Sequence, residues 1–246
     1  MRKIPRALYP YIGGFFLVSF FFSLFSPSEP SPAPTSSPTQ TESHSPSPTQ
    51  SETATADASP AATEEPAEPV GELAELLAQL TLAPEMGEGY DRDLFRHWID
   101  SDGDGCNTRR EVLIAEAIEK PSVVGDCDLV GGVWYSIYDD VTTSDPGDFD
   151  IDHFIPLKEA WDSGAHSWSA SQRRAFANNL SNPQALIAVT ASSNRSKSDR
   201  DPADWLPPNQ NYHCQYIIDW VSVKIFWNLS VDEREFQAIR RVAASC

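Results

Sequence analysis

Basic side chains are scarce in this sequence. Its 246 residues include 18 Lys and Arg against 36 Asp and Glu, which gives a formal net charge of −18. Residues 26–90 hold 11 acidic residues and no Lys or Arg. This balance excludes a protein that coats nucleic acid through bulk charge, but it does not exclude an enzyme that binds a phosphate with a few residues.

Large apolar residues are nearly absent from residues 27–70, which are rich in Ser, Thr and Pro. Residues 26–70 hold 10 of the 20 prolines, whereas every Trp and every Cys follows residue 97. A segment of this composition cannot bury enough apolar surface to offset the entropy lost on ordering. We therefore expect residues 27–70 to form a disordered, extended stalk and residues 90–246 to form the packed domain.

A basic start precedes an apolar run at residues 12–25. Fourteen residues of helix rise only ~21 Å, less than the ~30 Å hydrocarbon core of a bilayer. The pattern predicts that residues 1–26 are an export signal. Because no A-x-A cleavage motif follows, an uncleaved membrane anchor is the alternative. In either case the domain is expected outside the cell, secreted or tethered to the membrane.

Residues 71–89 connect the stalk to the domain. Leu73, Leu76, Leu77 and Leu80 recur at helical spacing, which predicts an amphipathic helix that docks on the domain. A solvated spacer helix is the alternative.

No C-x-x-C pair is present, which argues against a cysteine zinc cluster. The four cysteines of an exported chain are instead expected to form disulfides. Four cysteines allow three connectivities. We favour the pairing of neighbours along the chain, Cys106 with Cys127 and Cys214 with Cys246.

An acidic loop has the spacing of a calcium site. Asp100, Asp102 and Asp104, followed by a glycine and then by Glu111, fit the pattern D-x-[DN]-x-[DN]-G-x5-E. Such a loop supplies the oxygens that Ca²⁺ requires. The alternative is a loop organised by a disulfide from the adjacent Cys106, with its charged side chains in structural ion pairs.

The most informative segment is Asp148–Leu157. Phe149 and Ile151 alternate with aspartates, which predicts a short strand whose acidic face ends at Asp152 and His153.

A second short apolar strand is expected at residues 186–189. A helix should follow it, with Ser192 or Ser193 as its N-cap and Pro202 as its end.

These residue types suit the hydrolysis of a phosphodiester. Attack by water needs a base that titrates near neutrality, and His153 is the candidate. Charge that develops on the phosphoryl oxygens calls for a divalent cation. Asp152 and Asn194 offer hard oxygens suited to one Mg²⁺ or Mn²⁺ ion. Arg195 or Lys197 can bind a phosphate at the helix start.

The combined pattern resembles a known family. Asp152-His153-x-x-Pro156, then a strand, then Asn194-Arg195-x-Lys197 is similar to the HNH (ββα-metal) endonucleases. More narrowly, the chain resembles exported bacterial HNH proteins related to the C-terminal domain of the GmrSD restriction endonucleases. The segments that carry this narrower resemblance are 90–93, 102–106, 173–179, 186–189, 194–199 and 205–208.

The resemblance implies an α+β fold, in which a ββα-metal core is embedded in a mostly helical, disulfide-stapled domain. It implies that Asp152 and Asn194 bind the metal, that His153 is the general base and that Lys197 contacts phosphate.

Family members often place an Asn just before the second strand, where it orients the base histidine. Ala185 stands at that position here. Gln184, Asn182 or Asn179 would have to take the role.

Basic residues are unevenly distributed within the domain. Residues 91–172 carry a net charge of −12 and residues 173–246 a net charge of +2. The nucleic-acid contacts expected on this more basic half are Arg173, Arg174, Arg195 and Lys197. Such a surface suits transient, salt-sensitive contact with a phosphate backbone.

We therefore expect an exported, monomeric, metal-dependent endonuclease that hydrolyses DNA, with DNA favoured over RNA. One alternative is a non-catalytic, calcium-stabilised surface module with a decayed nuclease site. Another is a metal-dependent phosphodiesterase that acts on a different polymer.

Overall fold

A computed structural model describes residues 72–182 and 184–246. The leader predicted at residues 1–26 and the stalk predicted at residues 27–70 lie outside these ranges. Among the described residues, no helix combines the length and the apolar character needed to cross a membrane.

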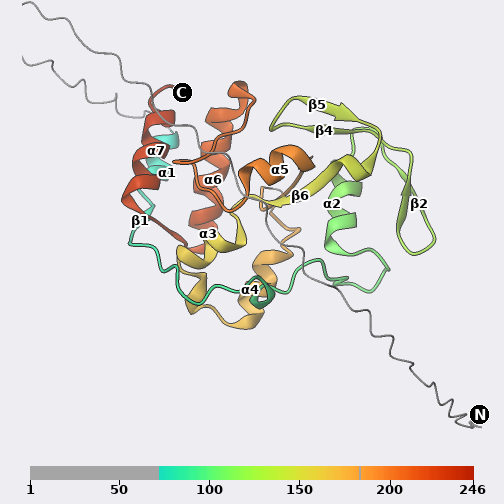
Figure 1. Cartoon of the computed structure of the whole chain (residues 1–246), viewed down its shortest axis with the longest axis horizontal. Coiled ribbons are helices and arrows are strands. Elements are labelled where there is room, and N and C mark those ends of the chain that lie inside the picture. The colour runs from blue at the N-terminus through green and yellow to red at the C-terminus, as the bar shows by residue number, and fades with distance from the viewer. Residues whose placement is uncertain (1–71, 183) are drawn as a thin grey trace, which may run out of the picture. The chain divides into compact units, whose positions relative to one another are not determined.

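The described chain combines helices with short, two-stranded sheets, so the expectation of an α+β domain is confirmed. The helices are α1 (Glu72–Leu77), α2 (Thr108–Glu116), α3 (Leu157–Asp162), α4 (Ala170–Ala177), α5 (Ala191–Lys197), α6 (His213–Trp227) and α7 (Glu233–Ala243). The strands are β1 (Thr81–Leu82), β2 (Ser122–Val124), β3 (Asp128–Val130), β4 (Trp134–Ser136), β5 (Val141–Thr143), β6 (Phe149–His153), β7 (Leu186–Thr190) and β8 (Ser230–Val231). The pairs β2–β3, β4–β5 and β6–β7 are antiparallel, and β1–β8 is parallel. Helices α1, α6 and α7 lie together on one side of the molecule, and α2 lies with β2 to β5 on the other (Figure 1).

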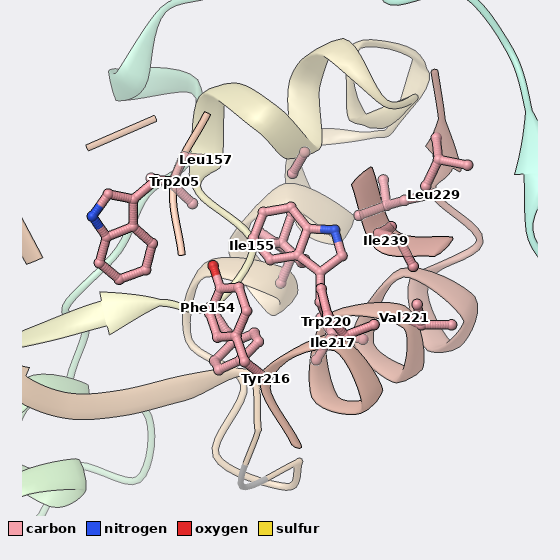
Figure 2. Close-up of a cluster of buried hydrophobic side chains, with 14 of the residues drawn as sticks. Phe154, Ile155, Leu157, Trp205, Tyr216, Ile217, Trp220, Val221, Leu229 and Ile239 are labelled. Carbon is pink, nitrogen blue, oxygen red and sulfur yellow. The ribbon is translucent and has the colours of Figure 1, made fainter. Parts of the chain in front are cut away.

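Helix α6 is apolar on nearly every turn because it forms the centre of the larger core. Figure 2 shows its Tyr216 and Trp220 against Phe154, which directly follows β6. Leu73 and Leu77 of α1 are buried in the same core. The predicted amphipathic helix therefore docks on the domain.

A buried ammonium in α6 joins this helix to α3, α7 and β8. Lys224 Nζ lies 2.6 Å from Glu159 Oε1 of α3 and 2.7 Å from Glu235 Oε2 of α7. It also donates to Ser163 Oγ and to the carbonyl of Ser230, both at 2.9 Å. Each buried charge thus has a partner, which is the condition under which such a cluster is tolerated.

A smaller core lies between α2 and one face of the β6–β7 pair. Phe149 and Ile151 contribute to it, together with Leu113 of α2 and Trp134 of β4. Side chains alternate along a strand, so the aspartates of β6 point to the opposite face. The apolar side chains of β6 therefore pack in the smaller core, and its aspartates lie on the other face of the strand.

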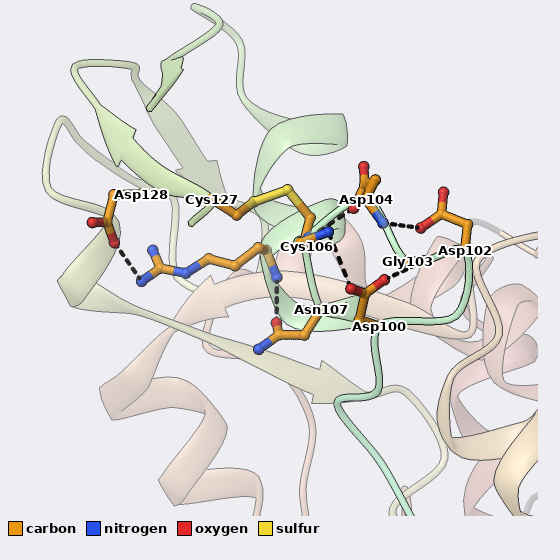
Figure 3. The surroundings of a disulfide bond; sticks show 10 residues. Asp100, Asp102, Gly103, Asp104, Cys106, Asn107, Cys127 and Asp128 are labelled. Atoms are coloured by element: carbon orange, nitrogen blue, oxygen red, sulfur yellow. Dashed lines mark hydrogen bonds and ion pairs between the residues drawn. A yellow bond between two sulfur atoms is a disulfide. The ribbon is translucent and has the colours of Figure 1, made fainter. Parts of the chain in front are cut away.

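Both predicted disulfides are confirmed. Cys106 pairs with Cys127, which ties the acidic loop to the turn between β2 and β3 (Figure 3). Cys214 pairs with Cys246, which ties the start of α6 to the C-terminus.

The ends of α5 differ from those expected. Its N-cap is Thr190 rather than Ser192 or Ser193, because β7 runs directly into the helix and Thr190 Oγ1 accepts from the backbone N–H of Ser193 at 3.3 Å. The helix ends at Lys197, well before Pro202, because its C-cap Ser198 has a φ of 54°, outside the right-handed helical region.

Glu116, at the end of α2, provides a pH test of this packing. Its Oε2 accepts from the backbone N–H of Ala188 in β7 at 2.8 Å. Burial raises the pKa of this carboxyl from 4.5 to about 7, against the opposing effect of that hydrogen bond. The folded protein keeps a proton that the unfolded chain has lost, so stability should fall as the pH rises through this window.

We expect Glu116→Gln to remove this loss, because the amide oxygen can still accept from Ala188 and carries no charge. Above about pH 7 the variant should be roughly 3 kcal/mol more stable than the wild type, with a much smaller difference near pH 4.5. Urea unfolding at the two pH values measures this. The exposed Glu119→Gln is the control, and equal pH dependence in all three proteins would contradict the expectation.

Candidate active site

The β6–β7 pair and α5 position the residues predicted to carry the chemistry. Asp152 pairs in register with Ile187, and His153 with Leu186. Helix α5 lies on the aspartate face of β6, where Asn194 Nδ2 is 3.3 Å from Asp150 Oδ2.

One polar cavity of about 360 Å³ opens beside these elements. Asp152, His153 and Asn194 all line it, so the structure brings together three residues that the sequence predicted to lie at one site. Neighbouring residues on a strand face opposite ways. Asp152 and His153 nevertheless reach one cavity because β6 ends at His153 and the chain turns through Pro156 along the same wall.

His153 is held as a neutral imidazole. It is buried, and its Nε2 lies 3.0 Å from the carbonyl oxygen of Ala177. A carbonyl only accepts, so Nε2 carries the hydrogen and Nδ1 keeps a free lone pair. Burial is the main cause that lowers the pKa of His153 to about 3, with a smaller contribution from nearby positive charges and against the opposing effect of the Ala177 hydrogen bond. The ring is therefore uncharged at neutral pH.

The residue that orients His153 is thus Ala177, at the end of α4, and not Gln184, Asn182 or Asn179. Asn179 Oδ1 accepts from the backbone N–H groups of Ser181 and Asn182, and Asn182 Oδ1 accepts from that of Gln184. These side chains stabilise their own turn. Every residue has a carbonyl, so the sequence carries no signal for the role of Ala177.

Residues just before α2 form another wall around His153, which the sequence did not indicate. The Trp98 ring lies 5.0 Å from the imidazole, centroid to centroid, at an angle of 34°. Trp98 has a φ of 54°, a left-handed conformation that is rare for a bulky side chain. Asn178 holds this segment, since it accepts from Ile99 N–H and donates to the carbonyl of Arg96. The packing restricts the plane of the His153 ring.

Asp152 and Lys197 form a buried ion pair. Lys197 Nζ lies 2.6 Å from Asp152 Oδ2 and 3.1 Å from the carbonyl of His153. Tyr138 also donates to Asp152 Oδ2, at 2.7 Å. Burial raises the pKa of Asp152, although Lys197 opposes the rise, and burial lowers the pKa of Lys197.

The side chain of Lys197 is wholly buried. This corrects the expectation that it contacts phosphate. Its ammonium holds Asp152 in place and is not presented to the cavity.

The lining of the cavity includes residues whose side chains carry oxygens of the kind that hard divalent cations prefer. Asp152 and Asn194 line it, and the carboxylate of Asp150 is hydrogen-bonded to Asn194. Carboxylate and amide oxygens are the ligands that Mg²⁺ and Mn²⁺ prefer. Asp150 was not among the predicted ligands, although its alternation with Ile151 places it on the same face of β6 as Asp152.

Only some of the expected nucleic-acid contacts lie at the cavity. Arg195 lines the cavity and is 76% exposed, with Nε 3.5 Å from Asp150 Oδ2. Arg173 lies elsewhere and donates to the carbonyls of Leu94, Ala165 and Trp168. Arg174 is exposed and lines a separate hollow beside Arg173. The expectation that Arg173 contacts nucleic acid is therefore corrected, because its guanidinium is used within the fold.

The acidic loop brings its aspartates together (Figure 3). Carboxylate oxygens of Asp100, Asp102 and Asp104 lie within 4.8 Å of one another. Asp100 also accepts from the backbone N–H of Gly105 at 3.0 Å. Among the described residues, the buried Oε2 of Glu111 has no hydrogen-bond partner, and burial and the three aspartates raise the pKa of that carboxyl. The loop thus has the arrangement of a cation site as well as a disulfide beside it.

Comparison with known proteins relates this chain to one family. The family model for the C-terminal domain of the GmrSD restriction endonucleases matches residues 108–242. A protein of Arthroderma benhamiae, described as an uncharacterized secreted protein, is 46% identical over 172 residues, which is 70% of this chain and 83% of the relative. No solved structure matches. The bacterial setting of the resemblance stays a prediction.

The buried pair yields a test of what Lys197 does. Lys197→Met leaves Asp152 buried without its cation, and we expect a loss of about 3–5 kcal/mol in the free energy of unfolding. Arg195→Met, at an exposed position in the same helix, should cost less than about 0.5 kcal/mol. Urea unfolding of both variants measures the difference. A Lys197→Met variant as stable as the wild type would show that the pair is not structural.

Proposed function

We propose that this chain, which belongs to the family of the GmrSD restriction endonuclease C-terminal domains, is a metal-dependent endonuclease that hydrolyses DNA phosphodiester bonds. The observation that carries the proposal is the convergence of Asp152, His153 and Asn194 on one polar cavity. In this assignment β6, β7 and α5 are the ββα-metal core.

His153 acts as the general base. The carbonyl of Ala177 holds the hydrogen on Nε2, so Nδ1 is the atom that takes a proton from the attacking water. A phosphate in the cavity brings negative charge beside the imidazole, which favours its protonated form and raises the pKa of His153 during the reaction. Trp98 keeps the ring in one plane while the proton moves.

Asp152 and Asn194 hold the catalytic Mg²⁺ or Mn²⁺. When bound, this ion would act as a Lewis acid and stabilise negative charge on the phosphoryl and leaving oxygens. Tyr138 and Lys197 position the carboxylate of Asp152 through their hydrogen bonds to Oδ2.

The substrate enters the cavity from the solvent-exposed side, where Arg195 lies. Arg195 is exposed there and contacts the phosphate backbone, which makes binding transient and salt-sensitive. A monomer suffices for this assignment, because the proposed residues all come from one chain.

Two observations support export. Disulfides form in oxidising compartments, and this domain has two. The relative from Arthroderma benhamiae is described as secreted. We place the domain outside the cell. Residues 1–26 are predicted to be an export signal, with an uncleaved membrane anchor as the alternative.

The nuclease assignment predicts nicking of supercoiled plasmid in the presence of Mg²⁺ or Mn²⁺, and loss of activity with EDTA. His153→Ala should lower kcat by roughly 10²–10⁴-fold with the fold intact, because the general base is lost. His166→Ala is the matched control, since His166 lies outside the lining of the cavity and its Nδ1 contacts the carbonyl of Trp161.

The outcomes separate the competing functions. Cleavage of a small phosphodiester without cleavage of DNA would favour a phosphodiesterase that acts on another polymer. A wild-type protein inactive on both would favour the non-catalytic module. Full activity in His153→Ala would show that the assigned base is wrong.

We also propose that the loop from Asp100 to Glu111 binds Ca²⁺, supported by the unpartnered Oε2 of Glu111 beside three aspartates. Extracellular sites of this kind bind Ca²⁺ with dissociation constants of about 10⁻⁴–10⁻³ M. Calcium at ten times that constant should stabilise the fold by about 1.4 kcal/mol, visible as a higher melting temperature. Asp104→Ala, which removes the ligand oxygen, should abolish the shift, and the exposed Asp126→Ala should retain it.

Differential scanning calorimetry with Ca²⁺ and with EDTA measures these shifts. No shift in the wild type would leave the disulfide as the sole organiser of the loop. A shift that survives Asp104→Ala would place the ion elsewhere.

A further inference from the structure

Arg92 lines the same cavity as Asp152, His153 and Asn194. It belongs to a short 3-10 turn, Arg92–Leu94, that precedes the residues matched by the family model. Its position in the sequence, in an acidic stretch next to Asp91 and Asp93, did not indicate a role in the chemistry.

The charges around the cavity leave an anionic substrate with few cationic partners. Asp152 and Asp199 line the cavity and repel a phosphate. Lys197 is buried against Asp152, and Arg195 lies beside Asp150. Arg92 is the other arginine in the lining. Its guanidinium lies within hydrogen-bonding reach of the Tyr90 hydroxyl, and among residues 72–182 and 184–246 it forms no ion pair with a carboxylate.

The backbone around Arg92 is firmly held. Asp91 caps the turn by accepting from the backbone N–H of Asp93 at 2.9 Å. Phe95 is fully buried between aromatic rings, with the Phe176 centroid 6.2 Å away. Arg173 donates to the carbonyl of Leu94 at 3.4 Å. The turn is therefore anchored on both sides of Arg92, although the side chain itself reaches solvent.

We propose that Arg92 binds the substrate phosphate in this cavity, an inference that rests on the proposed phosphodiester hydrolysis. A guanidinium presents two parallel N–H donors to two phosphate oxygens and keeps its charge at any working pH. Placed beside the general base, it stabilises the charge that develops on the phosphoryl oxygens. The catalytic unit then extends beyond residues 108–242, because an N-terminal turn completes it.

The test compares Arg92→Gln and Arg92→Lys with Arg96→Gln in the full chain. Arg96 is the matched control, because it is an exposed arginine four residues further on and lines a different hollow. Loss of a charged donor to the transition state costs about 10²–10³-fold, so Arg92→Gln should lower kcat/KM on duplex DNA by about that factor. Arg92→Lys keeps the charge without the two-pronged geometry and should lie between. Arg96→Gln should stay close to wild type.

DNA binding gives a second readout that does not require cleavage. In a His153→Ala background, Arg92→Gln should reduce the slope of log K against log salt concentration by about 1, because one phosphate contact is lost. Melting temperatures check that each variant is folded. If Arg92→Gln does not fold, Arg92→Lys decides: tenfold lower kcat/KM at an unchanged melting temperature supports the proposal.

The results distinguish this inference from the proposed function. If the wild type cleaves DNA and Arg92→Gln loses no more activity than Arg96→Gln, the role of Arg92 is overturned and the nuclease assignment stands. If the wild type and the variants differ only in stability, the role is likewise overturned. A wild type that cleaves no DNA overturns both.

Discussion

The buried ion pair between Asp152 and Lys197 is the interaction on which the geometry of the cavity depends. Two charges removed from water are tolerated only while each keeps its partner, because a lone buried charge costs several kcal/mol. The pair joins the end of β6 to the last turn of α5, and Tyr138 adds a hydrogen bond from outside both elements. With strand and helix held together, Asn194 lies one turn earlier in α5 and lines the same cavity.

A second constraint comes from the segment of residues 90–99, which lies outside the region matched by the family model and contributes Arg92 to the lining of the cavity. Trp98 adopts a left-handed backbone conformation, which costs about 1–3 kcal/mol and persists only where the surroundings enforce it. Here Asn178 binds the backbone on both sides of Trp98, and Phe95 anchors the segment in the larger core. The wall against His153 is therefore part of the packed fold.

The acidic composition has a structural consequence for substrate binding. Two of the few lysines form ion pairs inside the domain. Lys197 pairs with Asp152, and Lys224 pairs with Glu159 and Glu235. The guanidinium of Arg173 likewise donates to backbone carbonyls within the fold. Few cations are left to face solvent near the cavity, so binding of a polyanion depends on individual arginines. Under the proposed nuclease function, this arrangement predicts a weak, salt-sensitive complex.

Local patterns predicted much of this protein, because strand periodicity and the proximity of cysteines along the chain are local properties. The alternation around Ile151 predicted β6, the run at residues 186–189 predicted β7, and neighbouring cysteines predicted both disulfides. The sequence by itself therefore determined which chemical groups are present at the ends of these elements. Only the tertiary structure decided which of them line the cavity: it buried Lys197, placed the carbonyl of Ala177 against the His153 ring and brought Arg92 to the cavity. Burial and backbone contacts of this kind arise from packing between distant segments, and no local pattern encodes them.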